Sequence, residues 1–138
     1  MKQYVIDCSF SSALFLPDEN SERISDFFKN LSKSDMINVP HLWWYETNNV
    51  LNISVKKKRI SHNDFTAVIE LFSQMKIETD SAYGLSFSKE IFDLSQVYNL
   101  SSYDPVYLEL AMRKKGRLMS LDNELIIAAG KIGIPCGF

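Results

Sequence analysis

The sequence predicts an α/β fold in which a mostly parallel sheet of about five strands is flanked by helices on both faces. Short apolar runs, typical of buried strands, alternate with segments whose apolar residues recur at helical spacing. An aspartate follows the first of these runs, and another follows the fourth. The length of 138 residues suits a single domain, and we expect residues 1–138 to form it.

The first expected strand covers residues 4–6 and stops at Asp7. Ser9 is a suitable cap for a short helix that would continue to Leu16, because Pro17 breaks it. Apolar residues at helical spacing over 24–31 predict the next helix, and the run 36–39 predicts the second strand.

A longer helix is expected after Pro40, and the basic run 56–59 closes it where positive charge suits the helix dipole. One face of this helix is expected to consist of Leu42, Glu46, Asn49, Val50 and Ile53. Glu46 therefore falls within a predicted apolar stripe. Ser61 and Asp64 resemble a capping box for the following helix. Its expected inner face consists of Phe65, Val68, Ile69, Phe72 and Met75. A third strand is expected at 77–79.

The remaining elements continue the alternation. A helix is expected over 83–98, with Tyr83, Phe87, Ile91, Leu94 and Tyr98 on its inner face. Ser102 and Pro105 predict the start of the next helix, which places Asp104 at a helix N-terminus, and Gly116 is expected to end it. The fourth strand, 117–120, is followed by Asp122. A short helix around 125–129 and a final strand at 134–136 complete the prediction.

The composition excludes several classes of protein. With five glycines in all, the chain has no glycine-rich phosphate loop of the P-loop or dinucleotide-binding type. A phosphatase of the haloacid dehalogenase kind needs a second aspartate where this chain has Ser9. Cys8 and Cys136 form no CxxC pair, which argues against a disulfide framework or a zinc knuckle. A net charge of −2 gives no overall attraction to phosphate.

Other features favour ordinary structural roles. The basic runs 56–59 and 113–117 are expected to be mostly solvated, and His41 and His62 to lie at the surface or at caps. The aromatic run 43–45 suits a core or a dimer interface better than base stacking. An early charge argues against a signal peptide, and no apolar run reaches the length of a bilayer span, so we expect a cytoplasmic protein with no membrane partner.

Acidic residues carry the chemistry that the sequence predicts. Asp7, Asp104 and Asp122 are all expected at the carboxyl edge of the sheet, where open parallel sheets bind ligands. Glu46 joins them only if its helix turns the predicted stripe toward that edge. Carboxylates about 4 Å apart repel by roughly 4 kcal/mol at an effective dielectric near 20. Protonation can relieve this repulsion, and so can a hard cation such as Mg²⁺ or Mn²⁺, which can activate water and neutralise a phosphate.

Four blocks of the sequence together resemble the PIN-domain family, most closely its VapC toxins. They are residues 4–9 (YVIDCS), 40–51 (PHLWWYETNNVL), 102–111 (SYDPVYLELA) and 120–122 (SLD), in the family's order and spacing. In one mild departure, Pro105 stands where the family often has alanine.

This resemblance implies a Mg²⁺-dependent endoribonuclease, with Asp7, Glu46, Asp104 and Asp122 as its acidic quartet. Ser9 and Ser120 match neighbouring hydroxyls of the family that would orient acids or water, and Asn49 is a further supporting candidate. The expected partners are an RNA substrate, a small antitoxin that covers the cleft, and a second copy in a homodimer. The alternative is a non-catalytic module of the same fold that binds RNA or protein and has a vestigial acidic site.

Overall fold

The computed structural model describes residues 1–19, 22–101 and 103–138. Its sheet is parallel throughout and has the strand order β3-β2-β1-β4 over these residues. The strands are β1 (Gln3–Ile6), β2 (Met36–Pro40), β3 (Ile77–Asp80) and β4 (Arg117–Met119). The predicted α/β class and the parallel sheet are therefore confirmed, while the predicted role of Ser102 in starting a helix falls outside the described residues.

The sheet has one strand fewer than the predicted number of about five, because within the described part of the chain residues 134–136 form no full strand. They add one parallel bridge, between Leu118 and Cys136. Two hydrogen bonds of 2.8 Å flank this bridge, from Leu118 N to the Pro135 carbonyl and from Gly137 N to the Leu118 carbonyl. Proline cannot donate to a ladder, and Gly137 turns the chain with a φ of 77°, so pairing stops there.

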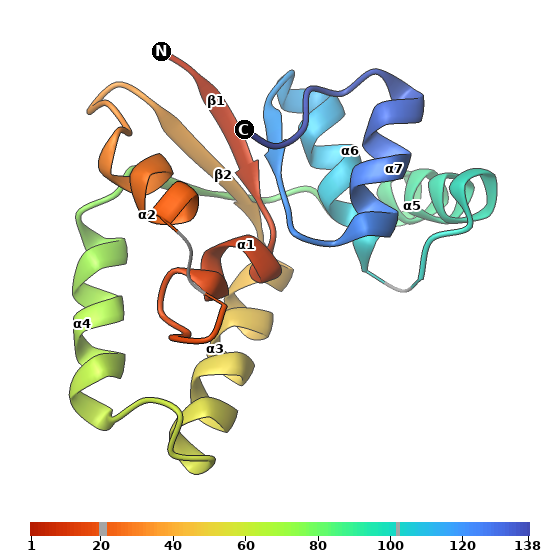
Figure 1. The fold of residues 1–138 in the computed structure, drawn as a ribbon. Coiled ribbons are helices and arrows are strands. Elements are labelled where there is room, and N and C mark those ends of the chain that lie inside the picture. The colour runs from red at the N-terminus through yellow and green to blue at the C-terminus, as the bar shows by residue number, and fades with distance from the viewer. Residues whose placement is uncertain (20–21, 102) are drawn as a thin grey trace.

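Helices lie on both sides of the sheet, as the sequence predicts (Figure 1). On one side are α1 (Cys8–Ala13), α2 (Glu22–Lys29), α3 (His41–Lys56) and α4 (His62–Ser73). On the other are α5 (Leu85–Tyr98), α6 (Asp104–Lys114) and α7 (Asn123–Ile132). In the part of the chain that the structure covers, no helix combines the length and the apolar character that crossing a bilayer requires.

The strand order creates a switch point between β1 and β4. From β1 the chain builds outward through β2 and β3, and it then returns to add β4 on the other side of β1. Ligands of open parallel sheets bind at such a point, outside the carboxyl ends of the strands. Asp7 directly follows β1, and Ser120 directly follows β4, so the fold places both at this point.

The buried face of α3 differs from the predicted stripe by one position. Its buried residues are Trp43, Thr47, Leu51 and Ser54. Two of these are small and polar, so an apolar periodicity does not reveal them. The Trp43 indole is buried and donates to Ser11 Oγ at 3.0 Å, which joins α3 to α1. Glu46 consequently lies at the border of the buried face, only half-buried.

Helix ends agree with the sequence at some places and differ at others. The capping box of Ser61 and Asp64 is present at the start of α4. Asp7, and not Ser9 as predicted, caps α1 by accepting from Phe10 N, and α1 ends at Ala13. At the end of α6 the left-handed residue is Lys115, with a φ of 51°. Gly116 instead allows close approach of β1, since a Cβ there would lie 3.3 Å from the Gln3 carbonyl oxygen.

Two predicted inner faces include residues that are exposed. Ile69 of α4 is exposed, and Tyr83 precedes α5 with 88% of its surface accessible. None of the residues of α5 is buried, and this helix packs mainly along α6. Periodicity alone cannot distinguish a helix that covers a core from one that covers another helix. Of the aromatic run 43–45, Trp43 is in the core, whereas Trp44 and Tyr45 are exposed.

Candidate active site

Asp7 is held by three donors at the end of β1. Its Oδ1 accepts from Phe10 N at 2.9 Å and from Ser9 Oγ at 2.7 Å, and its Oδ2 accepts from Ser120 Oγ in a short hydrogen bond. The side chain is only 5% exposed. A carboxylate can be buried only if hydrogen-bond donors replace the water molecules that solvated it. These three hydrogen bonds therefore stabilise Asp7 in its buried position.

The two serines also fix the loop that follows β4. Ser9 Oγ accepts from Leu121 N at 3.0 Å, and Ser120 Oγ accepts from Asp122 N at 3.0 Å. Each hydroxyl therefore donates to Asp7 and accepts from the β4 loop. The backbone continues this link, since Asp7 N donates to the Met119 carbonyl at 3.1 Å. Two segments far apart in sequence are thereby joined at the switch point.

Asp122 and Asp104 stand at the N-termini of two helices. Asp122 caps α7, where its Oδ1 accepts from Glu124 N at 2.9 Å and from Leu125 N at 3.2 Å. Asp104 is the first residue of α6, with Pro105 in the same first turn as predicted. Glu124 joins them, and one carboxylate oxygen from each of these three acids lies within 4.8 Å of the other two.

Glu46 reaches the site from α3 and is held by a tyrosine of α6. The Tyr107 hydroxyl donates to Glu46 Oε1 at 2.5 Å. This contact joins the two helices that carry Glu46 and Asp104. Asn49 lies on α3 three residues beyond Glu46, and it is exposed.

The electrostatics show that these acids act on one another. Burial raises the pKa of Asp104 to about 6, with further contributions from the charges of Asp122, Asp7, Glu46 and Glu124. Burial also raises the pKa of Asp7 and of Glu46, although hydrogen bonds to Ser120 and Tyr107 respectively oppose the increase. The fold therefore places carboxylate oxygens of Asp104 and Asp122 within 4.8 Å of one from Glu124, while Asp7 and Glu46 lie outside that group but near enough for their charges to act on Asp104.

The donor set suits a hard divalent cation. It consists of carboxylate oxygens, the ligands that Mg²⁺ and Mn²⁺ prefer, and the charges of its acids add to the effect of burial, which is the main cause of the raised pKa of Asp104. Among the described residues, no salt bridge involves any of the acids at the site (Asp7, Glu46, Asp104, Asp122 and Glu124). A bound cation would offset this repulsion.

Sequence reasoning missed two side chains of the site, Glu124 and Tyr107. Glu124 follows Asp122 by two residues in a helix first turn, where an acid is ordinarily explained by the dipole. Tyr107 falls at a buried helical position, where its ring is explained by packing. Only the fold reveals that Glu124 faces Asp104 and that the tyrosine hydroxyl meets Glu46.

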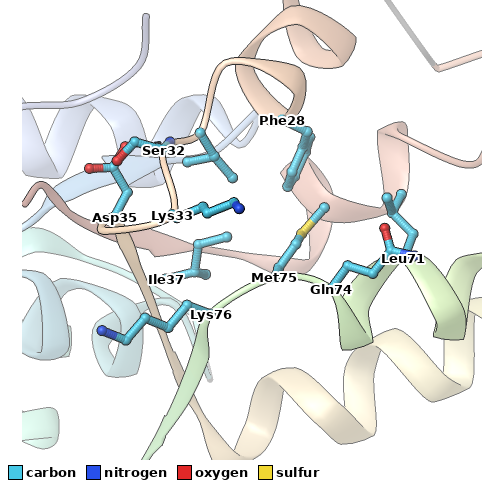
Figure 2. Close-up of a pocket in the computed structure, with 10 residues that line it drawn as sticks. Phe28, Ser32, Lys33, Asp35, Ile37, Leu71, Gln74, Met75 and Lys76 are labelled. Atoms are coloured by element: carbon cyan, nitrogen blue, oxygen red, sulfur yellow. Dashed lines mark hydrogen bonds between the residues drawn. The ribbon is translucent and has the colours of Figure 1, made fainter.

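A pocket elsewhere in the molecule has a different chemistry. It lies at the amino ends of β2 and β3, the opposite edge of the sheet from the acids. Figure 2 shows Phe28, Lys33 and Met75 pointing into it. Asp35, which lines it, accepts from Lys2 N at 2.9 Å and from Ser32 N at 3.0 Å. The described residues that line this pocket include no cluster of acids, and the pocket is separate from the candidate active site.

The PIN-domain family model matches residues 4–131, which is most of the chain and contains every acid described above. The chain belongs to the PIN-domain family. The resemblance seen in the sequence is thereby confirmed.

Individual relatives agree with this assignment. Ribonuclease VapC3 of Pyrobaculum aerophilum is 25% identical over 125 residues, which cover 88% of this chain and 90% of that protein. The crystal structure of PAE2754 from the same organism has a TM-score of 0.67 at 20% identity and covers 92% of this chain and 79% of its own. Mycobacterium tuberculosis VapC20, a toxin that cleaves the sarcin–ricin loop, has a TM-score of 0.66 at 14% identity, with 91% and 94% covered. These two structures show that the PIN fold is shared.

Proposed function

We propose that this protein is a divalent-metal-dependent endoribonuclease, and that Asp7, Glu46, Asp104 and Asp122 form its catalytic and metal-binding site. The observation that carries the proposal is the convergence of acids at one edge of the sheet, where Asp104, Asp122 and Glu124 offer oxygens within 4.8 Å of one another and the charges of Asp7 and Glu46 act on Asp104. Membership in the PIN family and similarity to a protein named Ribonuclease VapC3 support RNA as the substrate.

Each side chain of the site has a separate role in this proposal. Asp104, Asp122 and Glu124 present oxygens close enough to share one Mg²⁺ or Mn²⁺. When bound, the ion would offset the carboxylate repulsion and stabilise the charge that grows on a phosphate during hydrolysis. Ser9 and Ser120 keep Asp7 oriented, with one donor on each of its oxygens. Among the described residues, Tyr107 donates to Glu46 Oε1 and no hydrogen bond engages Oε2, so Oε2 can accept a proton from a water.

The partners follow from the relatives rather than from contacts in this chain. We propose that the protein is the toxin of a toxin–antitoxin pair, that a small antitoxin covers the acidic site, and that two copies form a dimer. The similarity to VapC3 and VapC20 supports the toxin–antitoxin assignment, and the dimer is proposed from the family resemblance. Co-expression with the protein encoded by a small adjacent gene, followed by size-exclusion chromatography, tests it: a joint peak is expected, and independent elution would refute the pairing.

The catalytic proposal is tested by incubating the purified protein with structured RNAs and matched DNAs in Mg²⁺, Mn²⁺ or EDTA. We expect cleavage of RNA only with metal, and its loss in Asp7→Asn and Asp122→Asn. Asp26→Asn, at an exposed aspartate of α2, is the matched control and should cleave normally. Equal cleavage by Asp7→Asn would refute the assigned site. Absence of cleavage with metal-dependent RNA binding would favour the alternative of a non-catalytic binding module.

A further inference from the structure

Tyr107 lies in the hydrophobic core with its polar end directed at the acidic site. Its side chain is 2% exposed, and it belongs to α6, which packs against β1 and β2. Three residues earlier, α6 begins at Asp104. The ring is thus anchored in the core, while the hydroxyl reaches Glu46 Oε1 at 2.5 Å.

Glu46 depends on this contact more than Asp7 or Asp122 depends on any single donor. Asp7 has three donors, and Asp122 has two backbone donors. Within the described residues, Tyr107 is the only donor to the Glu46 side chain, and no salt bridge includes Glu46. A glutamate has three rotatable side-chain bonds, so a half-buried one with a single donor loses its fixed position when that donor is removed.

The direction of the hydrogen bond is settled by chemistry. A phenol has an ordinary pKa of about 10 and is protonated at neutral pH, whereas an ionised carboxylate only accepts, so Tyr107 is the donor and Glu46 the acceptor. The donated proton occupies Oε1 and leaves Oε2 for a water or a cation. Groups that orient a metal-binding side chain in this way commonly change metal affinity or activity by about 10- to 100-fold when removed.

We propose that Tyr107 is a positioning residue that fixes Glu46 for metal binding and RNA cleavage, and that its hydroxyl, rather than its ring, supplies this role. The inference rests on the function proposed above. It adds a link between α3 and α6 that makes the placement of Glu46 depend on the helix that carries Asp104.

Tyr107→Phe tests the inference, because it keeps the ring in the core and removes only the oxygen. Mn²⁺ affinity, measured by isothermal titration calorimetry, should fall by about 10-fold or more. In RNA cleavage, kcat should fall while KM for RNA stays unchanged. Tyr4→Phe, at a half-buried tyrosine of β1, is the matched control and should match the unsubstituted protein in both assays.

A double-mutant cycle with Glu46→Gln separates positioning from a general structural effect. If Tyr107 acts through Glu46, then Tyr107→Phe should weaken Mn²⁺ binding strongly in the native background and by less than about 2-fold in Glu46→Gln. Equal losses in both backgrounds, or native Mn²⁺ affinity and kcat in Tyr107→Phe, would overturn the inference while leaving the proposed function intact. If the unsubstituted protein neither binds Mn²⁺ nor cleaves RNA, both are overturned.

Discussion

Replacing Asp104 by asparagine should stabilise the metal-free protein at neutral pH. The pKa of Asp104 is raised from 3.8 to about 6 by burial and by the charges of its acidic neighbours. At 1.36 kcal/mol per pKa unit this corresponds to roughly 3 kcal/mol of unfavourable interaction of the charged form. The side chain is only partly buried, and solvent screening reduces the expected gain to about 1 kcal/mol.

The stability gained by Asp104→Asn should increase with pH. Asp104 binds a proton more readily in the folded chain than in the unfolded chain, so its favourable contribution is fully present below about pH 4. That contribution is lost as the pH rises toward about 6, the folded-state pKa. The asparagine side chain carries no charge at any pH, and the advantage of Asp104→Asn should therefore appear above pH 6 and disappear near pH 4.

Urea unfolding in EDTA at pH 7.5 and pH 4.0 measures the effect, and a thermal melt should show an increase of a few degrees at pH 7.5. Asp26→Asn, on the exposed surface of α2, serves as the control and should change neither the free energy of unfolding nor the melting temperature appreciably. Adding Mg²⁺ should narrow the difference between Asp104→Asn and the unsubstituted protein, because the ion relieves the repulsion that the substitution removes. A destabilised variant at pH 7.5, or a gain that is the same at both pH values, would refute the electrostatic argument.

Three further predictions concern the site and its support. Mg²⁺ or Mn²⁺ should raise the melting temperature of the unsubstituted protein, and an unchanged melt at millimolar metal would contradict acid clustering. Ser120→Ala should cost about 2 kcal/mol in urea unfolding, because the buried hydroxyl donates to Asp7 and accepts from Asp122 N; a loss below about 0.5 kcal/mol would refute that role. Ser61→Ala should cost about 1 kcal/mol through the capping box with Asp64 without altering Mn²⁺ affinity, and a change in affinity would indicate unexpected coupling to the site.

The edge of the sheet that holds the site was predictable because it depends on a few local patterns. A buried run that ends at Asp7, and a helix start at Asp104, place both acids at the carboxyl edge of a parallel sheet. The predicted capping box at Ser61 succeeded for a related reason, since both of its partners lie within one turn. Such patterns involve residues that are close together in the sequence.

Long-range contacts were not predictable from one sequence. The buried face of α3 was misplaced because Thr47 and Ser54 are small polar residues, which hydropathy does not mark as buried. Glu46 was placed within an apolar stripe, yet it meets the site from the border of that face through a tyrosine 61 positions away. The final strand did not form because a proline and a left-handed glycine limit it to a single bridge, a balance that apolar content does not reveal.

A crystal structure of the protein soaked in Mn²⁺, with the ion located by anomalous scattering, tests the convergence of the acids most directly. We expect a peak coordinated by oxygens of Asp104 and Asp122, with Asp7 or Glu46 bound directly or through a water. Manganese bound elsewhere, with Asp7, Asp104 and Asp122 making no contact to any ion, would contradict the account.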